Sequence, residues 1–144
     1  MEFIIWLNAV GRGSKVVLVA YNGLRFDAKI LLSKIIEFKL KKEFTNICIG
    51  FVDPFVMVKE LYPNCPKKGQ DAMMNHFKLH AKHEDQTHNA ILDCNDLRRL
   101  TKKIYQEQSK KNPSEKSSQA RFCMRYFQSI EDIAAENNAA CVLS

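Results

Sequence analysis

Four polar side chains in this 144-residue sequence have types and positions that suit metal-dependent or acid–base chemistry. Asn22 and Asp27 follow an apolar run, and His88 and Asp93 lie five residues apart in a later segment. Carboxylates are the hard oxygen ligands that Mg²⁺ prefers, and a histidine has a pKa near neutral pH, so it can take a proton from water. We therefore treat Asn22, Asp27, His88 and Asp93 as the candidate functional residues.

The first pair follows a predicted buried strand. Val16–Ala20 is an uninterrupted apolar run between glycine-containing turns, which is typical of a strand covered on both faces in an α/β sheet. Ligands bind beyond the carboxyl ends of such strands, which is where Asn22 and Asp27 stand. Residues 26–38 predict the next helix. Its apolar residues occupy well over a third of its surface, so we expect it to be largely covered.

The second pair stands at the start of a long helix predicted from Thr87 to about Glu107. Five residues of helix turn through about 500°, so the His88 and Asp93 side chains are offset by roughly 140°. Both can border one cleft only if His88 lies at the loop edge before the helix. Simpler interpretations also exist: Asp27 as an acid that the helix dipole favours, and His88 and Asp93 as ordinary surface residues.

The order of strand and helix signals indicates an α/β fold. A second buried strand is predicted over Ile47–Val52, followed by a helix that Pro54 opens. Two strands are too few to cover helices this apolar, so we expect part of the domain to be missing from the chain. The other predicted segments are the end of an apolar helix at residues 1–8, a loop at 65–70, a short helix over Asp71–Leu79 with Asp71 as N-cap, a loop at 80–86 and an amphipathic helix over Gln119–Ala140.

Two segments resemble motifs of the DEDDh-type 3′→5′ exonuclease family, whose fold is ribonuclease H-like. The family's second motif, roughly His-Asn-x-x-x-Phe-Asp after an apolar strand, is similar to Tyr21–Asp27, with Tyr21 in place of the usual histidine. The third motif, His-x-Ala-x-x-Asp, is similar to His88–Asp93, and Gly50–Phe55 looks like the strand and helix between the two. The resemblance covers about residues 1–107.

The resemblance implies a metal-dependent nuclease site. In it, Asp27 and Asp93 would be metal ligands, His88 the general base and Asn22 a support for the strand end or the substrate. Two Mg²⁺ or Mn²⁺ ions about 4 Å apart would clamp the scissile phosphate at a DNA or RNA 3′ end. The family's first motif, Asp-x-Glu, does not occur in the sequence. Half of the metal-ligand set is therefore absent, and we expect this chain by itself not to cleave.

This interpretation divides the chain into three parts. We expect an exonuclease-like domain at residues 1–107, with a partial sheet that lacks its N-terminal strands, then a polar linker at 108–118 and a helical tail at 119–144. The alternative is a noncatalytic module that binds nucleic acid or another protein. An Asp-x-Glu on an upstream strand would favour the nuclease.

The charge is compatible with a nucleic-acid partner without requiring one. The net charge is +6 and the isoelectric point is about 9.1. Residues 1–107 hold 17 basic and 12 acidic side chains. Small basic clusters are more often solvated faces, but clusters that converge on one face would attract phosphates by releasing counterions. The clusters are Lys39, Lys41 and Lys42; Lys67 and Lys68; Arg98 and Arg99; and Lys102 and Lys103.

Cysteine usage and hydropathy point to an intracellular protein, either nuclear or cytoplasmic. Five cysteines without a C-x-x-C pair argue against a secreted disulfide framework, and no run of 18 apolar residues predicts a transmembrane helix. Cys65, His76, His80 and His83 are potential zinc donors, although their spacing matches none of the common sites.

The final four residues offer one further candidate site. Cys141 to Ser144 match the prenylation pattern C-a-a-X, with a last residue typical of farnesylation. Acidic residues precede Cys141 instead of a polybasic segment, so one lipid would give only weak membrane association. The alternative is a chance match.

Overall fold

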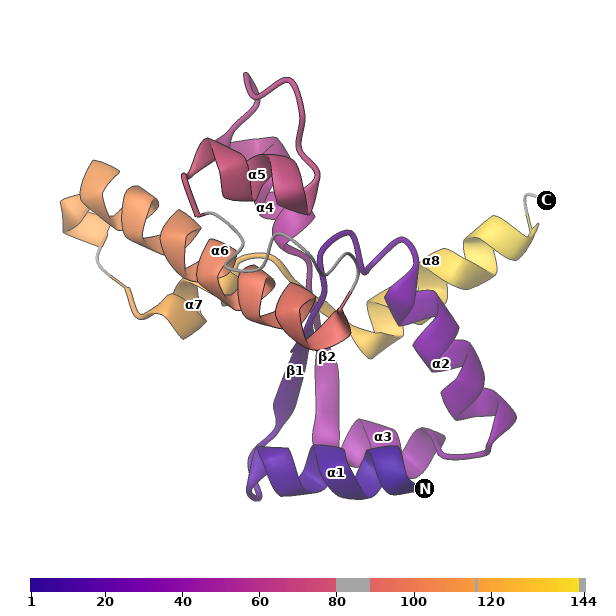
Figure 1. Cartoon of the computed structure of the whole chain (residues 1–144). Helices are drawn as coiled ribbons and strands as arrows, with labels where there is room; N and C mark the ends of the chain where they lie inside the picture. Colours follow the sequence, from indigo (N-terminus) through magenta and orange to yellow (C-terminus); the bar gives the residue numbers. More distant parts are fainter. Residues whose placement is uncertain (80–88, 116, 143–144) are drawn as a thin grey trace. The chain divides into compact units, whose positions relative to one another are not determined.

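The computed structural model describes residues 1–79, 89–115 and 117–142, with the side chains of Glu115 and of residues 137–142 left aside. Within these ranges the chain is an α/β protein with eight α-helices and a three-stranded mixed sheet (Figure 1). It forms two compact units: residues 1–53 together with 127–144, and residues 54–126. Both predicted strands and the α/β class are confirmed.

The first unit holds the sheet. Its strands follow the order β1-β2-β3, with β1 parallel to β2 and β3 antiparallel to β2, so β2 is central and the other two are edge strands. The elements are α1 (Glu2–Gly11), β1 (Val16–Val19), α2 (Asp27–Glu37), α3 (Lys41–Ile47), β2 (Cys48–Val52), β3 (Phe127–Ser129) and α8 (Ile130–Val142).

Helices at both ends of the strands build the core of this unit. α1 and α3 pack together at the amino-terminal end of β1 and β2, and α8 contacts α2, β2 and β3 (Figure 1). Burying these apolar side chains supplies the main stabilising force. The buried core consists of Ile4, Leu7, Ala28, Leu32, Ile35, Phe44, Cys48, Phe51, Ile130 and Ile133.

Two expectations about burial are wrong. β1 is not covered on both faces, since Val19 is 45% exposed at the edge of the sheet. α2 is not largely covered either, because Ile30 and Ile36 are 63% and 64% exposed. A three-stranded sheet offers α2 too little surface to bury apolar residues on more than one side.

The single helix expected over residues 119–140 is also wrong. The segment instead contains α7 (Gln119–Met124), the strand β3 and α8. β3 pairs with β2 through Val52 opposite Phe127 and Gly50 opposite Ser129. Pairing with the free edge of β2 overrides the helical periodicity, because it satisfies backbone groups that would otherwise be unpaired.

The second unit is helical within the residues that the structure describes. α6, the longest helix, contacts α5, α7 and a short 3₁₀ turn, η1. None of the described helices of the chain has the length and apolar content needed to cross a lipid bilayer. The elements are α4 (Pro54–Leu61), α5 (Gln70–His76), α6 (Ala90–Lys111), η1 (Pro113–Glu115) and α7.

Boundaries in this unit differ from the predicted ones. α5 begins after Gly69 and ends at His76, so Asp71 lies in its first turn instead of capping it. The expected linker at residues 108–118 begins inside α6, and the Tyr105 hydroxyl donates a 2.7 Å hydrogen bond to the Ser117 carbonyl. That bond ties the segment after α6 back onto the helix.

Candidate functional site

The loop between β1 and α2, which carries two of the predicted site residues, is held by a buried carboxylate. Asp53 follows β2 and is only 2% exposed. It accepts hydrogen bonds from the backbone N–H groups of Asn22, at 2.7 Å, and Leu24, at 3.3 Å. Asn22 has a φ of 54°, a left-handed conformation that asparagine tolerates better than most residues. Asn22 therefore shapes the loop through its backbone.

Close packing fixes the same loop further. The Gly23 N–H donates to the Ala20 carbonyl, and a Cβ at position 23 would lie 2.3 Å from the Cβ of Ala20, so glycine is required there. Burial, together with the negative charge of Asp53, raises the pKa of Tyr21. Tyr21, at the position where the exonuclease motif that the segment resembles has histidine, is therefore a neutral hydrogen-bonding group at physiological pH.

Asp27 lies in the first turn of α2, as predicted, and its side chain is exposed. The helix dipole favours an acid there, so the position is compatible with a helix-stabilising role. Exposure is equally compatible with a ligand role. The loop that Asp53 holds places Asp27 beyond the carboxyl end of β1, where the sequence predicted it.

In the second unit, Asp93 lies in the first turn of α6. The Asn89 side chain caps this helix by accepting hydrogen bonds from the N–H groups of Ile91, at 3.0 Å, and Leu92, at 3.3 Å. Asp93 borders an open hollow of about 460 Å³. That hollow is also lined by Lys67, Gly69, Gln70, Asp71 and Ala72, and Gln70 donates a 3.0 Å hydrogen bond to the Asp93 carbonyl.

The other two predicted site residues fall outside what the structure describes. His88 lies in the range 80–88, and the side chain of Cys141 is among those left aside. Asp27 belongs to the first unit and Asp93 to the second, and each is described within its own unit. The general base and the lipidation site therefore stay predictions.

The described residues form no cluster that could hold the ions of the two-metal arrangement, which the family resemblance implies. Among them, no three histidine, cysteine, aspartate or glutamate side chains stand close enough together to hold a metal ion. Two bound Mg²⁺ ions need several carboxylate oxygens at one point. We therefore derive no chemical step through a metal at Asp27 or Asp93.

The structure brings together one pair of the predicted zinc donors. Cys65 Sγ lies 3.8 Å from Nδ1 and 4.0 Å from Nε2 of His76. Lys68 braces the loop that carries Cys65, since its ammonium group donates hydrogen bonds to the carbonyls of Pro63 and Cys65. His80 and His83 lie outside the described residues. Two donors are half of a structural zinc site.

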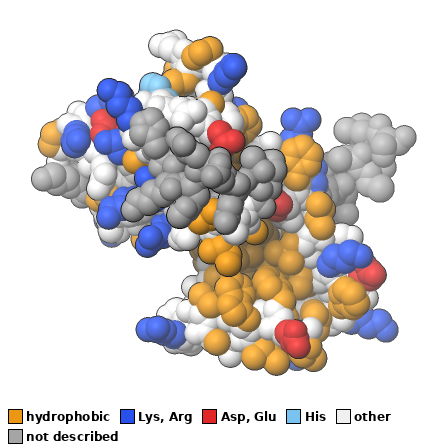
Figure 2. Space-filling view, in the orientation of Figure 1, with side chains coloured by type: hydrophobic (Ala, Val, Ile, Leu, Met, Phe, Trp, Pro, Cys, Tyr) orange, Lys and Arg blue, Asp and Glu red, His pale blue; other side chains and the backbone are white. Residues whose placement is uncertain are grey.

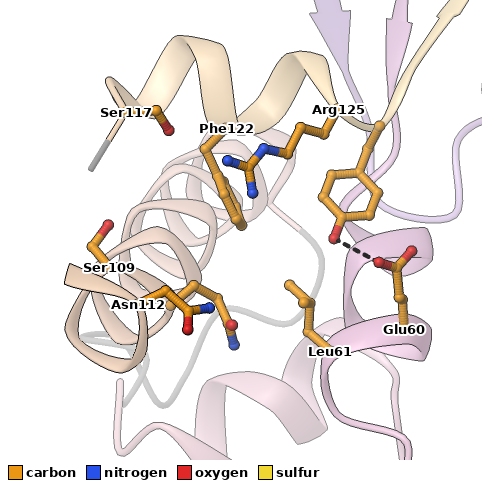
Figure 3. A pocket seen from close by; sticks show the side chains of 9 residues that line it. Glu60, Leu61, Ser109, Asn112, Ser117, Phe122 and Arg125 are labelled. Carbon is orange, nitrogen blue, oxygen red and sulfur yellow. Dashed lines mark hydrogen bonds between the residues drawn. The ribbon is translucent and has the colours of Figure 1, made fainter. Parts of the chain in front are cut away.

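A smaller hollow of about 190 Å³ lies where the carboxyl-terminal ends of α4 and α6 meet α7 (Figure 3). Tyr126 donates a 3.3 Å hydrogen bond to the Glu60 carboxylate, and the Arg125 guanidinium lies 5.9 Å from the centre of the Phe122 ring. We call it the Glu60–Arg125 hollow. Its lining residues are Glu60, Leu61, Gln108, Ser109, Asn112, Ser117, Phe122, Arg125 and Tyr126.

Sequence reasoning missed Asp53 and the Glu60–Arg125 hollow. Asp53 had a usable signal, because an acid directly after a buried strand stands at the edge of the sheet where loops meet. The hollow had no such signal, since its walls come from segments far apart in the sequence.

Comparisons of the chain with protein families, curated proteins and solved structures found no match.

Proposed function

We propose that this chain is an exonuclease-like domain of ribonuclease H-like fold that binds DNA or RNA 3′ ends and does not cleave them by itself. The observation that carries the binding proposal is the distribution of charge. The second unit has 14 basic and 8 acidic residues and the first has 8 of each, which together make the chain's 22 and 16. The whole excess of six positive charges therefore belongs to the second unit.

Two cations on α6 are the best placed to bind phosphate. Arg98 and Lys102 are both exposed and lie four residues apart, so they share one face of the helix. Their neighbours are already paired: Arg99 bonds Asp96 at 3.1 Å, and Lys103 bonds Glu107 at 2.9 Å. Arg98 and Lys102 have no such acidic partner among the described residues and can release counterions when a phosphate binds.

Two further features support the exonuclease-like part of the proposal. The residues of its second and third motifs, Asp27 and Asp93, are exposed in first helical turns and have no buried structural role. Among the described residues, β1 also pairs on one side only. A strand that carried the family's Asp-x-Glu could add to that free edge, and only then would the ligand set be complete.

Binding can be tested by fluorescence anisotropy with single-stranded DNA and RNA over a range of salt concentrations. The double variant Arg98→Glu/Lys102→Glu should bind at least tenfold more weakly and have a shallower salt dependence. The matched control is Lys41→Glu/Lys42→Glu in the first unit, which makes the same change of charge on exposed side chains. Equal losses in the two variants would contradict a binding surface on α6.

Cleavage is tested separately with 3′-labelled DNA and RNA in the presence of Mg²⁺ or Mn²⁺. We expect no metal-dependent degradation by the folded chain. Degradation that disappears in Asp27→Ala would overturn the noncatalytic proposal, since it would mean that carboxylates outside the recognised motifs complete the site.

A second candidate function, a protein-interaction module, is favoured by one observation in the first unit. Of the twelve large apolar side chains that are exposed in the described part of the chain, ten lie in this unit. Figure 2 shows hydrophobic side chains gathered over α1, α2 and the strands. Exposed apolar surface of this extent marks interaction sites. The ten are Met1, Phe3, Ile5, Trp6, Val10, Val19, Phe26, Ile30, Ile36 and Phe38.

A further inference from the structure

We infer that the Cys65 thiol, with His76 as its base, is a site of reversible modification by small anionic disulfides. Sγ of Cys65 lies 3.8 Å from Nδ1 and 4.0 Å from Nε2 of His76. The inference is carried by this contact, by the hollow beside it and by the charge around that hollow. The proposed nucleic-acid binding uses neither side chain, so the two stand or fall separately.

The pair supplies the two groups that a thiol–disulfide exchange needs. The thiolate is the attacking species, and the imidazole of His76 lies close enough to take the thiol proton as the attack occurs. A new S–S bond forms to Cys65 while the S–S bond of the small disulfide breaks. The Cys65 sulfur is oxidised, one sulfur of the small disulfide is reduced, and the departing thiolate receives the proton from His76. The product is a mixed disulfide, which a free thiol can reverse.

Neighbouring contacts hold both side chains in position. The His76 ring packs edge-on against Phe77, with ring centres 4.9 Å apart, and against Tyr62, with ring centres 6.0 Å apart. The ammonium group of Lys68 donates a hydrogen bond to the Cys65 carbonyl. Because the base and the loop that carries the thiol are both held, little ordering is needed when a disulfide binds.

An open hollow of about 440 Å³ gives the thiol room for a ligand. This volume is within the roughly 300–1,000 Å³ that is common for sites of small ligands. Apolar walls suit the methylene and sulfur atoms of a disulfide, and the amide of Asn64 can bond to peptide groups of a ligand. The apolar walls come from Leu61, Tyr62, Pro63 and Pro66.

The charge around this hollow favours an anionic ligand. Lys111 is exposed and lines the hollow, with its ammonium nitrogen 5.4 Å from the centre of the Tyr62 ring. None of the described residues that line the hollow is acidic. Positive charge draws in anionic reactants and opposes a metal dication, for which Cys65 and His76 would supply only two donors. A disulfide that carries carboxylates, such as oxidised glutathione, is therefore the expected class of reactant.

The other cysteines that the structure describes serve as internal references. Cys94 is more exposed than Cys65, but His76, the only histidine among the described residues, lies beside Cys65. Burial raises the pKa of the Cys48 and Cys123 thiols, which disfavours their thiolates. Exposure alone thus predicts that Cys94 reacts first, whereas pairing with His76 predicts that Cys65 does.

The test treats the full chain with oxidised glutathione and a metal chelator, and peptide mass spectrometry follows each cysteine. We expect Cys65 to form the mixed disulfide about tenfold faster than Cys94, because a positioned base assists only Cys65. His76→Gln should remove this advantage and leave the rate at Cys94 unchanged. A rate at Cys94 that equals or exceeds the rate at Cys65 in the unchanged chain would overturn the inference, and so would an unaltered Cys65 rate in His76→Gln.

An uncharged reagent, hydroxyethyl disulfide, tests the class of ligand. With each rate divided by that at Cys94, Cys65 should prefer oxidised glutathione by about threefold, since Lys111 attracts its carboxylates. Lys111→Gln should abolish this preference. Lys59→Gln should keep it, although it also removes an ammonium group that lies over an aromatic ring. A preference that survives in Lys111→Gln would overturn the choice of an anionic disulfide.

Discussion

The Asp53 carboxylate accepts a 2.7 Å hydrogen bond from the backbone N–H of Asn22, which lies 31 residues earlier in the chain. This bond joins the carboxyl end of β2 to the loop that follows β1. Because the same carboxylate also accepts a hydrogen bond from the Leu24 N–H at 3.3 Å, one buried side chain holds two backbone groups of the loop before α2. The placement of Asp27 therefore depends on Asp53.

Replacing Asp53 with alanine should lower the free energy of unfolding by about 3 kcal/mol, because two N–H groups lose a charged acceptor. Asp53→Asn keeps one acceptor oxygen and should cost about half as much. Urea denaturation measures both. Glu43→Ala, at an exposed acid of the same unit, is the control and should change stability by less than about 0.5 kcal/mol. Equal stability of Asp53→Ala and the control would refute the anchoring role.

Gly50→Ala should be strongly destabilising, since a Cβ there would lie 2.1 Å from the Gln128 carbonyl oxygen and 2.6 Å from the Phe127 ring. β3 would have to move away from β2, at a cost of about 3 kcal/mol or more. Gly69→Ala is the matched control, because no atom lies within 4 Å of its Cβ position and its φ is −63°. Thermal unfolding should separate the two, and a similar melting temperature for both would mean that β3 does not pair as described.

The sequence alone was sufficient to predict those helices and strands whose pattern lies in neighbouring residues. The apolar runs at Val16–Ala20 and Ile47–Val52 each gave a strand, and Pro54 marked the start of α4. β3 was missed because three residues are too few to display a period of two, and its stability comes from pairing with β2. Burial was misjudged for α2, because its apolar pattern says nothing about how much sheet is present to cover it.

The features of the candidate site likewise include some that the sequence could predict and others that it could not. The position of Asp27 beyond β1 follows from the strand and helix pattern, so it could be predicted. The role of Asp53 could not, because it depends on a contact between residues far apart in the sequence. The Glu60–Arg125 hollow forms where the ends of three helices lie close together, and no residue spacing in the sequence indicates that these ends are neighbours.

The exposed apolar side chains of α2 should affect association and leave folding nearly unchanged. Ile30→Ala removes a side chain that is 63% exposed and should change the free energy of unfolding by less than about 0.5 kcal/mol, whereas Leu32→Ala, at 7% exposure, should cost about 2–5 kcal/mol. Since exposed apolar side chains of the first unit are proposed as an interaction surface, light scattering at increasing concentration should show less association for Ile30→Ala than for the unchanged chain. If Ile30→Ala destabilises the chain as much as Leu32→Ala, Ile30 is buried in solution and the exposed face does not exist.

High pH should destabilise the fold through tyrosines. Burial raises the pKa of Tyr21, Tyr62 and Tyr126 above the ordinary value near 10, and Asp53 and Glu60 add to the effect at Tyr21 and Tyr126. Below that value the tyrosines are protonated in both the folded and the unfolded chain, so their contribution to stability is fully present. Above it the unfolded chain ionises first, and the free energy of unfolding falls as pH rises. Urea denaturation between about pH 9 and pH 11 should detect this fall, which Tyr21→Phe should reduce. An unchanged slope in Tyr21→Phe would mean that Tyr21 ionises as easily in the folded chain as in the unfolded one, contrary to its burial beside Asp53.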